Sequence, residues 1–165
     1  MTRHLLATVA SALLLAACTT SAPRSTTTIT TRAPLAGKVI GIDPGHNGLN
    51  YSATTFIAHQ VFNGRAMENC DTTGTSTNAG YSEARFNFAV AQFLRADLIS
   101  EGARVVMTRS TNAGVGPCIT RRAEILNLAH VDVAIDIHAD GAAGDDRGFA
   151  ILEPVADGPN NAMIG

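Results

Sequence analysis

Short apolar runs along the chain predict the strands of a sheet. The first run begins at Val39 and stops at Asp43, where a Pro and a Gly turn the chain. Three later apolar runs also predict strands, over residues 103–108, 131–138 and 148–152. Each run is short enough for a buried strand and too short for a buried helix. The chain therefore contains several candidate strands separated by other structure.

Two segments between these runs have helical periodicity. Residues 82–101 predict an amphipathic helix with Ser82 as its cap and Gly102 as its stop. Its apolar residues recur at spacings of three and four, and they are Phe86, Val90, Phe93, Leu94 and Leu98. Residues 120–129 predict a second helix. Strands that alternate with helices predict a single α/β domain, with a mostly parallel or mixed sheet flanked by helices on both faces.

Residues 49–80 form a long polar connection without a helical period. Within it, Asn63 and Gly64 separate two β-tolerant runs, Thr54–Phe62 and Arg65–Cys70, and this pair is typical of a type I′ hairpin. A connection of this length inside a compact domain is usually functional. We interpret it as a flap, and a surface hairpin without a role is the alternative.

The N-terminal segment has the pattern of an export signal. Residues 1–17 combine a basic start with a short apolar run and small residues, and residues 18–34 form a Thr/Ser/Pro-rich tether that precedes a domain over residues 35–165. The residues before Cys18 resemble a bacterial lipobox, which makes Cys18 a candidate for lipidation and membrane attachment. An ordinary cleavage site after Ala22 is the alternative. We expect a protein of the periplasm or cell wall.

Charge and cysteine content narrow the function further. The formal net charge is −2, and removal of residues 1–17 lowers the basic residues from 12 to 11 against 14 acids, which makes the mature charge about −3. This balance gives no reason to expect a nucleic-acid partner, and we expect a monomer.

Cys70 and Cys118 remain after export into an oxidising compartment, so one disulfide between them is expected. Two free thiols are the alternative.

Three residues form a candidate metal site. His46 follows the first predicted strand and His138 ends the third, so topology places both imidazoles at one edge of the sheet. Glu83 lies in the first turn of the long helix, which can present its amino-terminal end at that edge. Two His and one carboxylate are typical ligands of a catalytic Zn²⁺. The alternative is a surface histidine and a glutamate that interacts only with the helix dipole.

Short motifs resemble the zinc-dependent N-acetylmuramoyl-L-alanine amidases of the amidase type 3 family. They extend in order from Gly37 to about Leu152. They are DPGHNG at residues 43–48, Glu83 with Asn87, Thr108 with Arg109, Arg122 with Leu126 and Asn127, and DIHAD at residues 136–140. The resemblance implies that His46, Glu83 and His138 bind zinc, and that the substrate is the amide between N-acetylmuramic acid and L-alanine in peptidoglycan. It carries over no catalytic role for Arg109 or Arg122, which we expect to pair with acids such as Asp132 or Asp136.

The chain departs from the family pattern at two points. Asp136 and Asp140 replace the usual Ser and Asn, and no residue matches the general-base Glu of a late strand, which we expect beyond Gly165. Glu153 is the one acid near that region. We therefore interpret the domain as incomplete at its C-terminus and expect it to bind zinc loosely and to hydrolyse poorly or not at all. The alternatives are a non-catalytic envelope lipoprotein that binds wall peptides, and a zinc peptidase that acts on another peptidoglycan amide.

Overall fold

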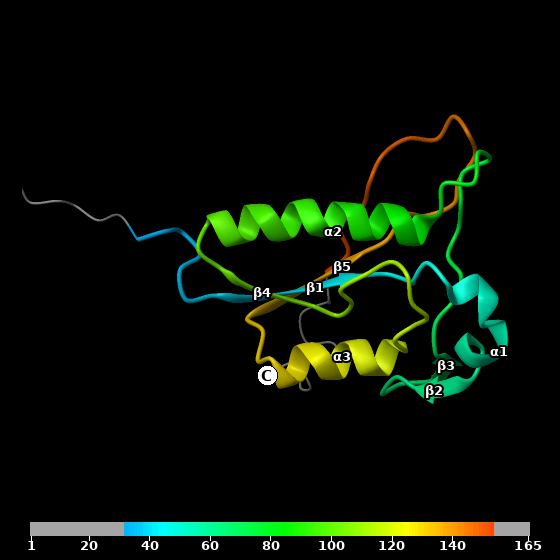
Figure 1. Ribbon diagram of the computed structural model, residues 1–165, viewed down its shortest axis with the longest axis horizontal. Coiled ribbons are helices and arrows are strands. Elements are labelled where there is room, and N and C mark those ends of the chain that lie inside the picture. The colour runs from blue at the N-terminus through cyan, green and yellow to red at the C-terminus, as the bar shows by residue number, and fades with distance from the viewer. Residues whose placement is uncertain (1–31, 154–165) are drawn as a thin grey trace, which may run out of the picture. The chain divides into compact units, whose positions relative to one another are not determined.

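The computed structural model describes residues 32–153, which form a three-stranded parallel sheet with a helix on each face (Figure 1). The strand order is β4-β1-β5, with β1 at Val39–Pro44, β4 at Arg104–Met107 and β5 at Val133–Ile137. Both strand pairings are parallel. The predicted fold class is confirmed. The predicted signal peptide, the tether up to residue 31 and Cys18 lie outside the described residues.

The central strand β1 supplies the middle of the core. Ile42 is completely buried, and Ile40 is 8% exposed, because neighbouring strands flank β1 and helices cover both of its faces. Pro44 of β1 pairs with Ile137 of β5, and the Gly45 amide donates to the Ile137 carbonyl at 3.0 Å. The two strands therefore end side by side, and the residues that follow them emerge at one edge of the sheet.

Helix α2, Glu83–Ser100, covers one face of the sheet (Figure 1). The Ser82 hydroxyl accepts a hydrogen bond from the Arg85 amide, so the predicted cap is present. Gly102 follows the C-cap residue Glu101 with a positive φ of 92°, which ends the helix. Its buried residues are Glu83, Ala84, Asn87 and Ala91. Phe93, expected on the apolar face, is 75% exposed, because small alanines occupy the side that lies against the strands.

Helix α3, Ile119–Leu128, covers the opposite face (Figure 1). Its Leu126 is 6% exposed and lies so close to β1 that a Cβ atom at Gly41 would come within 2.8 Å of the leucine side chain. Glycine at this position therefore lets the helix approach the central strand closely.

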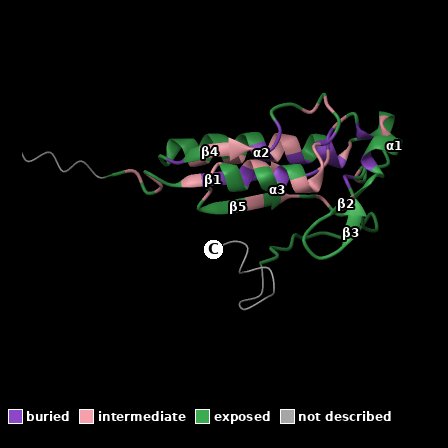
Figure 2. Cartoon of the chain, turned by 90° about the horizontal axis from the view of Figure 1, so that it is seen from below, coloured by how far each residue is buried: buried purple, intermediate pink, exposed green. Residues whose placement is uncertain are grey.

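The connection between β1 and α2 contains two short helices, η1 at Asn50–Ser52 and α1 at Thr54–Ile57, and then a hairpin. Strands β2, Gln60–Phe62, and β3, Met67–Asn69, form the hairpin, and Figure 2 shows that exposed residues predominate in it. The predicted β run Thr54–Phe62 therefore begins with helix α1. The turn also differs from type I′, because Gly64 has a positive φ and Asn63 does not; the Asn63 side chain instead accepts hydrogen bonds from the two amides of Arg65 and Ala66.

Residues 148–152 do not form the expected fourth strand. Phe149 is 92% exposed and Leu152 is 92% exposed, and the segment has no ladder partner among the described residues. In the part of the chain that the structure describes, strand β5 pairs with β1 alone. A strand needs a neighbour for its backbone hydrogen bonds, so the apolar run remains irregular here. Within residues 32–153, no helix has the length and apolar character needed to cross a membrane.

Candidate metal centre

His46 lies two residues beyond β1, where the chain adopts a positive φ of 59°. Its Nδ1 atom is 3.1 Å from Asp71 Oδ1 and 3.1 Å from the Thr72 carbonyl oxygen. Both neighbours are acceptors at neutral pH, so Nδ1 carries the proton and donates. The Nε2 atom therefore keeps its lone pair, and it lies 3.4 Å from Glu83 Oε1.

Glu83 begins α2 and directs its carboxylate toward the same point. Oε2 accepts from the Thr75 amide at 2.9 Å, and Oε1 accepts from the Ala139 amide at 3.0 Å. Burial opposes ionisation, but these two amides together with His138 and His46 outweigh it and lower the pKa of Glu83 to about 2. The side chain is thus a fixed carboxylate at neutral pH.

His138 follows β5 and completes the group. Its Nδ1 atom lies 2.9 Å from Glu83 Oε1, and its ring meets the His46 ring edge-on with centroids 4.8 Å apart. The His138 side chain is 44% exposed, whereas that of His46 is 10% exposed. The site is therefore enclosed on the His46 side and open to solvent beside His138.

The structure brings together the three residues that the sequence predicted as metal ligands. One ligand atom from each lies within 4.8 Å of the others. The donor set is two imidazoles and one carboxylate, which fits a catalytic zinc site with one position left for water or substrate. The carboxylate contributes one negative charge, so the bound ion would keep a net positive charge.

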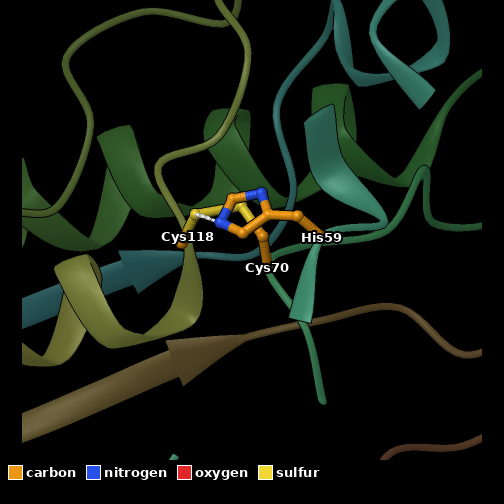
Figure 3. Close-up of side chains that lie close together, drawn as sticks. All are labelled: His59, Cys70 and Cys118. Atoms are coloured by element: carbon orange, nitrogen blue, oxygen red, sulfur yellow. Dashed lines mark hydrogen bonds between the residues drawn. A yellow bond between two sulfur atoms is a disulfide. The ribbon is translucent and has the colours of Figure 1, made fainter. Parts of the chain in front are cut away.

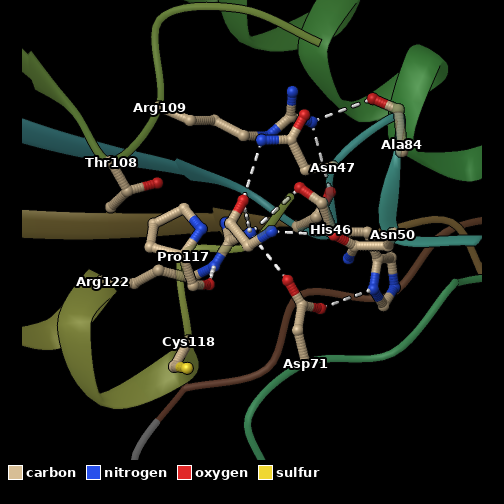
Figure 4. Close-up of polar contacts among 12 residues, drawn as sticks. His46, Asn47, Asn50, Asp71, Ala84, Thr108, Arg109, Pro117, Cys118 and Arg122 are labelled. Atoms are coloured by element: carbon tan, nitrogen blue, oxygen red, sulfur yellow. Dashed lines mark hydrogen bonds and ion pairs between the residues drawn. The ribbon is translucent and has the colours of Figure 1, made fainter. Parts of the chain in front are cut away.

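Asp71 forms a hydrogen bond with His46, and Arg122 forms an ion pair with Asp71; the sequence predicted neither contact. Arg122 is 3% exposed and donates to Asp43 Oδ1 at 2.7 Å and to Asp71 Oδ2 at 3.1 Å (Figure 4). Asp71 in turn accepts from His46. The expected pairing of this arginine with Asp132 or Asp136 is wrong, because the buried guanidinium faces the end of β1 and Asp71. No local pattern distinguishes Asp71 from the other polar residues of its loop.

Asp132 is engaged elsewhere. It accepts from the Val39 amide at 2.7 Å and pairs with Lys38 at 3.2 Å at the opposite end of β1. Among the described residues, Asp136 forms no ion pair with either arginine, and its carboxylate lies 3.5 Å from His138 Nε2. These carboxylates are therefore separate from the arginine network.

Arg109 fixes the backbone around the site. It is 6% exposed and donates to the carbonyl oxygen of Pro44 at 2.8 Å. It also donates to the carbonyl oxygen of Ala84 at 2.9 Å (Figure 4). Burial, with the neighbouring charge of Arg122, lowers the pKa of Arg109 to about 10. The guanidinium therefore ties the end of β1 to the start of α2 and has no direct contact with the three ligands.

A cleft of about 490 Å³ opens beside His46 and His138. The hairpin forms one wall through Gln60, Met67 and Asn69. Cys70, directly after β3, is bonded to Cys118, directly before α3, with an S–S distance of 2.08 Å. The disulfide thus attaches the base of the hairpin to α3. Glu153 is exposed and forms no hydrogen bond or ion pair with the metal-site residues within the described part of the chain.

Comparison with known proteins identifies related sequences. The family Amidase_3, described as N-acetylmuramoyl-L-alanine amidase, matches residues 40–158. An N-acetylmuramoyl-L-alanine amidase of Mycobacterium tuberculosis is 40% identical over 122 residues, which cover 73% of this chain and 49% of that protein.

Solved structures show the same relationship. An N-acetylmuramyl-L-alanine amidase from Mycobacterium abscessus, solved in its apo form, matches with a TM-score of 0.62 and 42% identity over 66% of this chain and 50% of that chain. The corresponding enzyme of Mycobacterium smegmatis matches with a TM-score of 0.63 and 37% identity over 67% of this chain and 50% of that chain. The chain thus spans about half the length of the relatives it matches.

Proposed function

This chain belongs to the Amidase_3 family of N-acetylmuramoyl-L-alanine amidases, and on that premise we propose that it hydrolyses the amide between N-acetylmuramic acid and L-alanine in peptidoglycan. We propose that His46, Glu83 and His138 bind the zinc ion that this reaction requires. The observation that carries the proposal is the convergence of their ligand atoms to within 4.8 Å.

A zinc ion in this donor set supplies Lewis acidity toward a substrate carbonyl and toward water. The chain's own residues prepare the site. Asp71 accepts the Nδ1 proton of His46 and so leaves Nε2 available as a ligand. The Thr75 and Ala139 amides hold the two oxygens of Glu83 in place before any ligand binds.

The cleft accounts for access of an extended substrate. Its lining contains His46 and His138 together with polar side chains of the hairpin, such as Gln60 and Asn69. Because His138 is the exposed member of the group, we place the scissile amide on its side of the site. Amide and hydroxyl groups of a peptidoglycan fragment can form hydrogen bonds with such a wall.

A peptidoglycan substrate places the function outside the cytoplasmic membrane, in cell-wall turnover. The export pattern of residues 1–17 supports this part of the proposal, and Cys18 is the candidate for lipidation. We propose the tether of residues 18–34 as the link between that anchor and the domain.

Zinc stoichiometry tests the ligand assignment. The chain should bind one zinc ion, and His46→Ala, Glu83→Gln and His138→Ala should each lose stoichiometric binding. His130→Asn is the matched control, because Asn suits the positive φ of 50° at that exposed position. Stoichiometric zinc in any of the three ligand variants would show that the ligands are wrongly assigned.

Product analysis tests the reaction. Incubation with a muramoyl peptide should release, at a low rate because no residue matches the general-base Glu, a peptide with a new L-alanine amino terminus, and a chelator should stop the release. Cleavage inside the stem peptide would favour the zinc-peptidase alternative. Binding of the muramoyl peptide by the zinc-loaded chain without any cleavage would favour the non-catalytic alternative.

A further inference from the structure

A second group of potential metal ligands lies at the base of the hairpin (Figure 3). It consists of His59, Cys70 and Cys118, and one ligand atom from each lies within 4.8 Å of the others. The two cysteines form the disulfide, and His59 Nε2 lies 3.7 Å from Cys118 Sγ. None of the three belongs to the His46–Glu83–His138 group.

The tautomer of His59 is set by the partner of its Nδ1 atom. Nδ1 lies within hydrogen-bond distance of the Phe56 carbonyl oxygen, which can only accept, so Nδ1 carries the proton. Nε2 then has a lone pair directed at a sulfur that has no proton to donate while the disulfide is intact. An imidazole that donates one N–H to a backbone carbonyl and keeps the other nitrogen free has the orientation typical of a metal ligand.

The three backbones are held together independently of the disulfide. The Cys70 amide donates to the His59 carbonyl at 2.8 Å, and the Ile119 amide donates to the Cys70 carbonyl at 2.8 Å. Reduction of the S–S bond removes neither hydrogen bond. The reduced side chains therefore remain neighbours.

The position of Cys118 favours its thiolate form. Cys118 is the N-cap residue of α3, a ten-residue helix, and its side chain makes no capping hydrogen bond. The positive end of a helix dipole stabilises a thiolate at this position. A thiolate is the form of cysteine that binds metal ions.

We propose that, in the reduced chain, His59, Cys70 and Cys118 bind a thiophilic divalent cation such as Zn²⁺ or Cd²⁺, at a site separate from the catalytic centre. A dithiol reductant gives two electrons to the disulfide and becomes a cyclic disulfide, while Cys70 and Cys118 each take up one proton. Metal binding then releases these two protons to solvent. Two thiolates and one neutral imidazole balance the charge of the cation and leave a fourth position for water.

The cluster thus has two alternative states, and in each of them a bond connects the hairpin to α3. In the oxidised chain the S–S bond joins the hairpin to the start of α3, and in the reduced chain the cation joins them. The hairpin that forms one wall of the catalytic cleft remains attached in both states.

Cadmium titration of the whole chain tests the site, because a cadmium–thiolate bond gives an ultraviolet charge-transfer band that the sulfur-free catalytic centre cannot produce. A Cys18→Ser background removes the third thiol. After reduction by dithiothreitol and its anaerobic removal, the chain should bind one more equivalent of Cd²⁺ than the oxidised chain and should show the band. Circular dichroism verifies that the reduced chain is folded.

His59→Ala in the same background distinguishes the proposed site from simple binding by a pair of thiols. Loss of this ligand should lower the Cd²⁺ affinity, measured from the intensity of the band, by more than the roughly 10- to 100-fold typical for loss of an outer-shell partner. The control His130→Asn should bind as the parent chain does. Equal affinity in His59→Ala, or a reduced chain that shows no band, whether folded or unfolded, would overturn the proposal.

Discussion

Asp71 connects the metal centre to the arginine network: its Oδ1 accepts from His46 Nδ1 at 3.1 Å, and its Oδ2 accepts from Arg122 at 3.1 Å. The hydrogen bond to His46 and the charge of Arg122 overcome the effect of burial and lower the pKa of Asp71. A carboxylate in this position fixes both the proton and the ring orientation of a metal-binding histidine.

Asp71→Ala should therefore weaken zinc binding by about 10- to 100-fold, because His46 loses the group that orients it. Competition with a chromophoric chelator measures the affinity. Asp132→Ala is the control, since Asp132 lies at the other end of β1 and pairs with Lys38. An unchanged zinc affinity in Asp71→Ala would mean that the Thr72 carbonyl alone is sufficient to orient His46.

Arg122→Met should destabilise the fold much more than the same change at the preceding residue, Arg121. Arg122 is 3% exposed, and its removal leaves the carboxylates of Asp43 and Asp71 without their partner, at a cost of about 3–5 kcal/mol. The Arg121 side chain is 54% exposed and, within residues 32–153, pairs with Glu124 alone, so Arg121→Met should cost less than about 1 kcal/mol. Urea unfolding of both metal-free variants measures the difference, and similar losses would contradict the proposed role of Arg122.

Gly45→Ala should damage the metal centre by steric contact alone. A Cβ atom at position 45 would lie 2.2 Å from a carbon of the His138 ring, so that the ring must move. We expect zinc affinity to fall by about 10- to 100-fold, as for the loss of other orienting contacts. Gly144→Ala is the control, because nothing lies within 4 Å of the added atom. Isothermal titration with Zn²⁺ measures both variants, and equal affinities would show that His138 is free to adjust.

The stability of the metal-free chain should depend on the ionisation of Glu83. The pKa of Glu83 falls from an ordinary 4.5 to about 2 in the folded chain, so below pH 4.5 the unfolded chain binds the proton first. The stabilisation is complete above about pH 4.5 and is lost as the pH falls toward 2. Glu83→Gln should flatten this part of the stability curve in urea titrations at several pH values. A slope as steep as that of the wild type would assign the acid sensitivity to other carboxylates.

Local sequence patterns predicted the parts of the fold that depend on near neighbours. The helix at residues 83–100 begins after Ser82 and ends before Gly102 as expected, because capping and periodicity are properties of adjacent residues. The strand predicted at residues 148–152 is wrong, because strand formation depends on residues that are distant in the sequence. Its apolar character permits a strand, but a strand forms only where a distant segment offers an edge.

The exposed face of α2 also shows that local patterns do not predict which side chains are buried. Phe93 fits the helical repeat, yet the structure buries Ala84 and Ala91 against the sheet instead. Periodicity indicates that a helix has an apolar side, whereas the distance between helix and sheet selects which side chains fit.

The amino-acid sequence by itself determined the order along the chain of β1, α2, β4, α3 and β5 and the three residues expected to bind metal, since strand ends and a helix start can be recognised from local composition. Only the tertiary structure decided that Asp71 and Arg122 form hydrogen bonds with His46 and that His59 lies beside the disulfide. These contacts join residues 25 to 76 positions apart, and they form only when the chain is folded. No local pattern encodes a partner at such a distance.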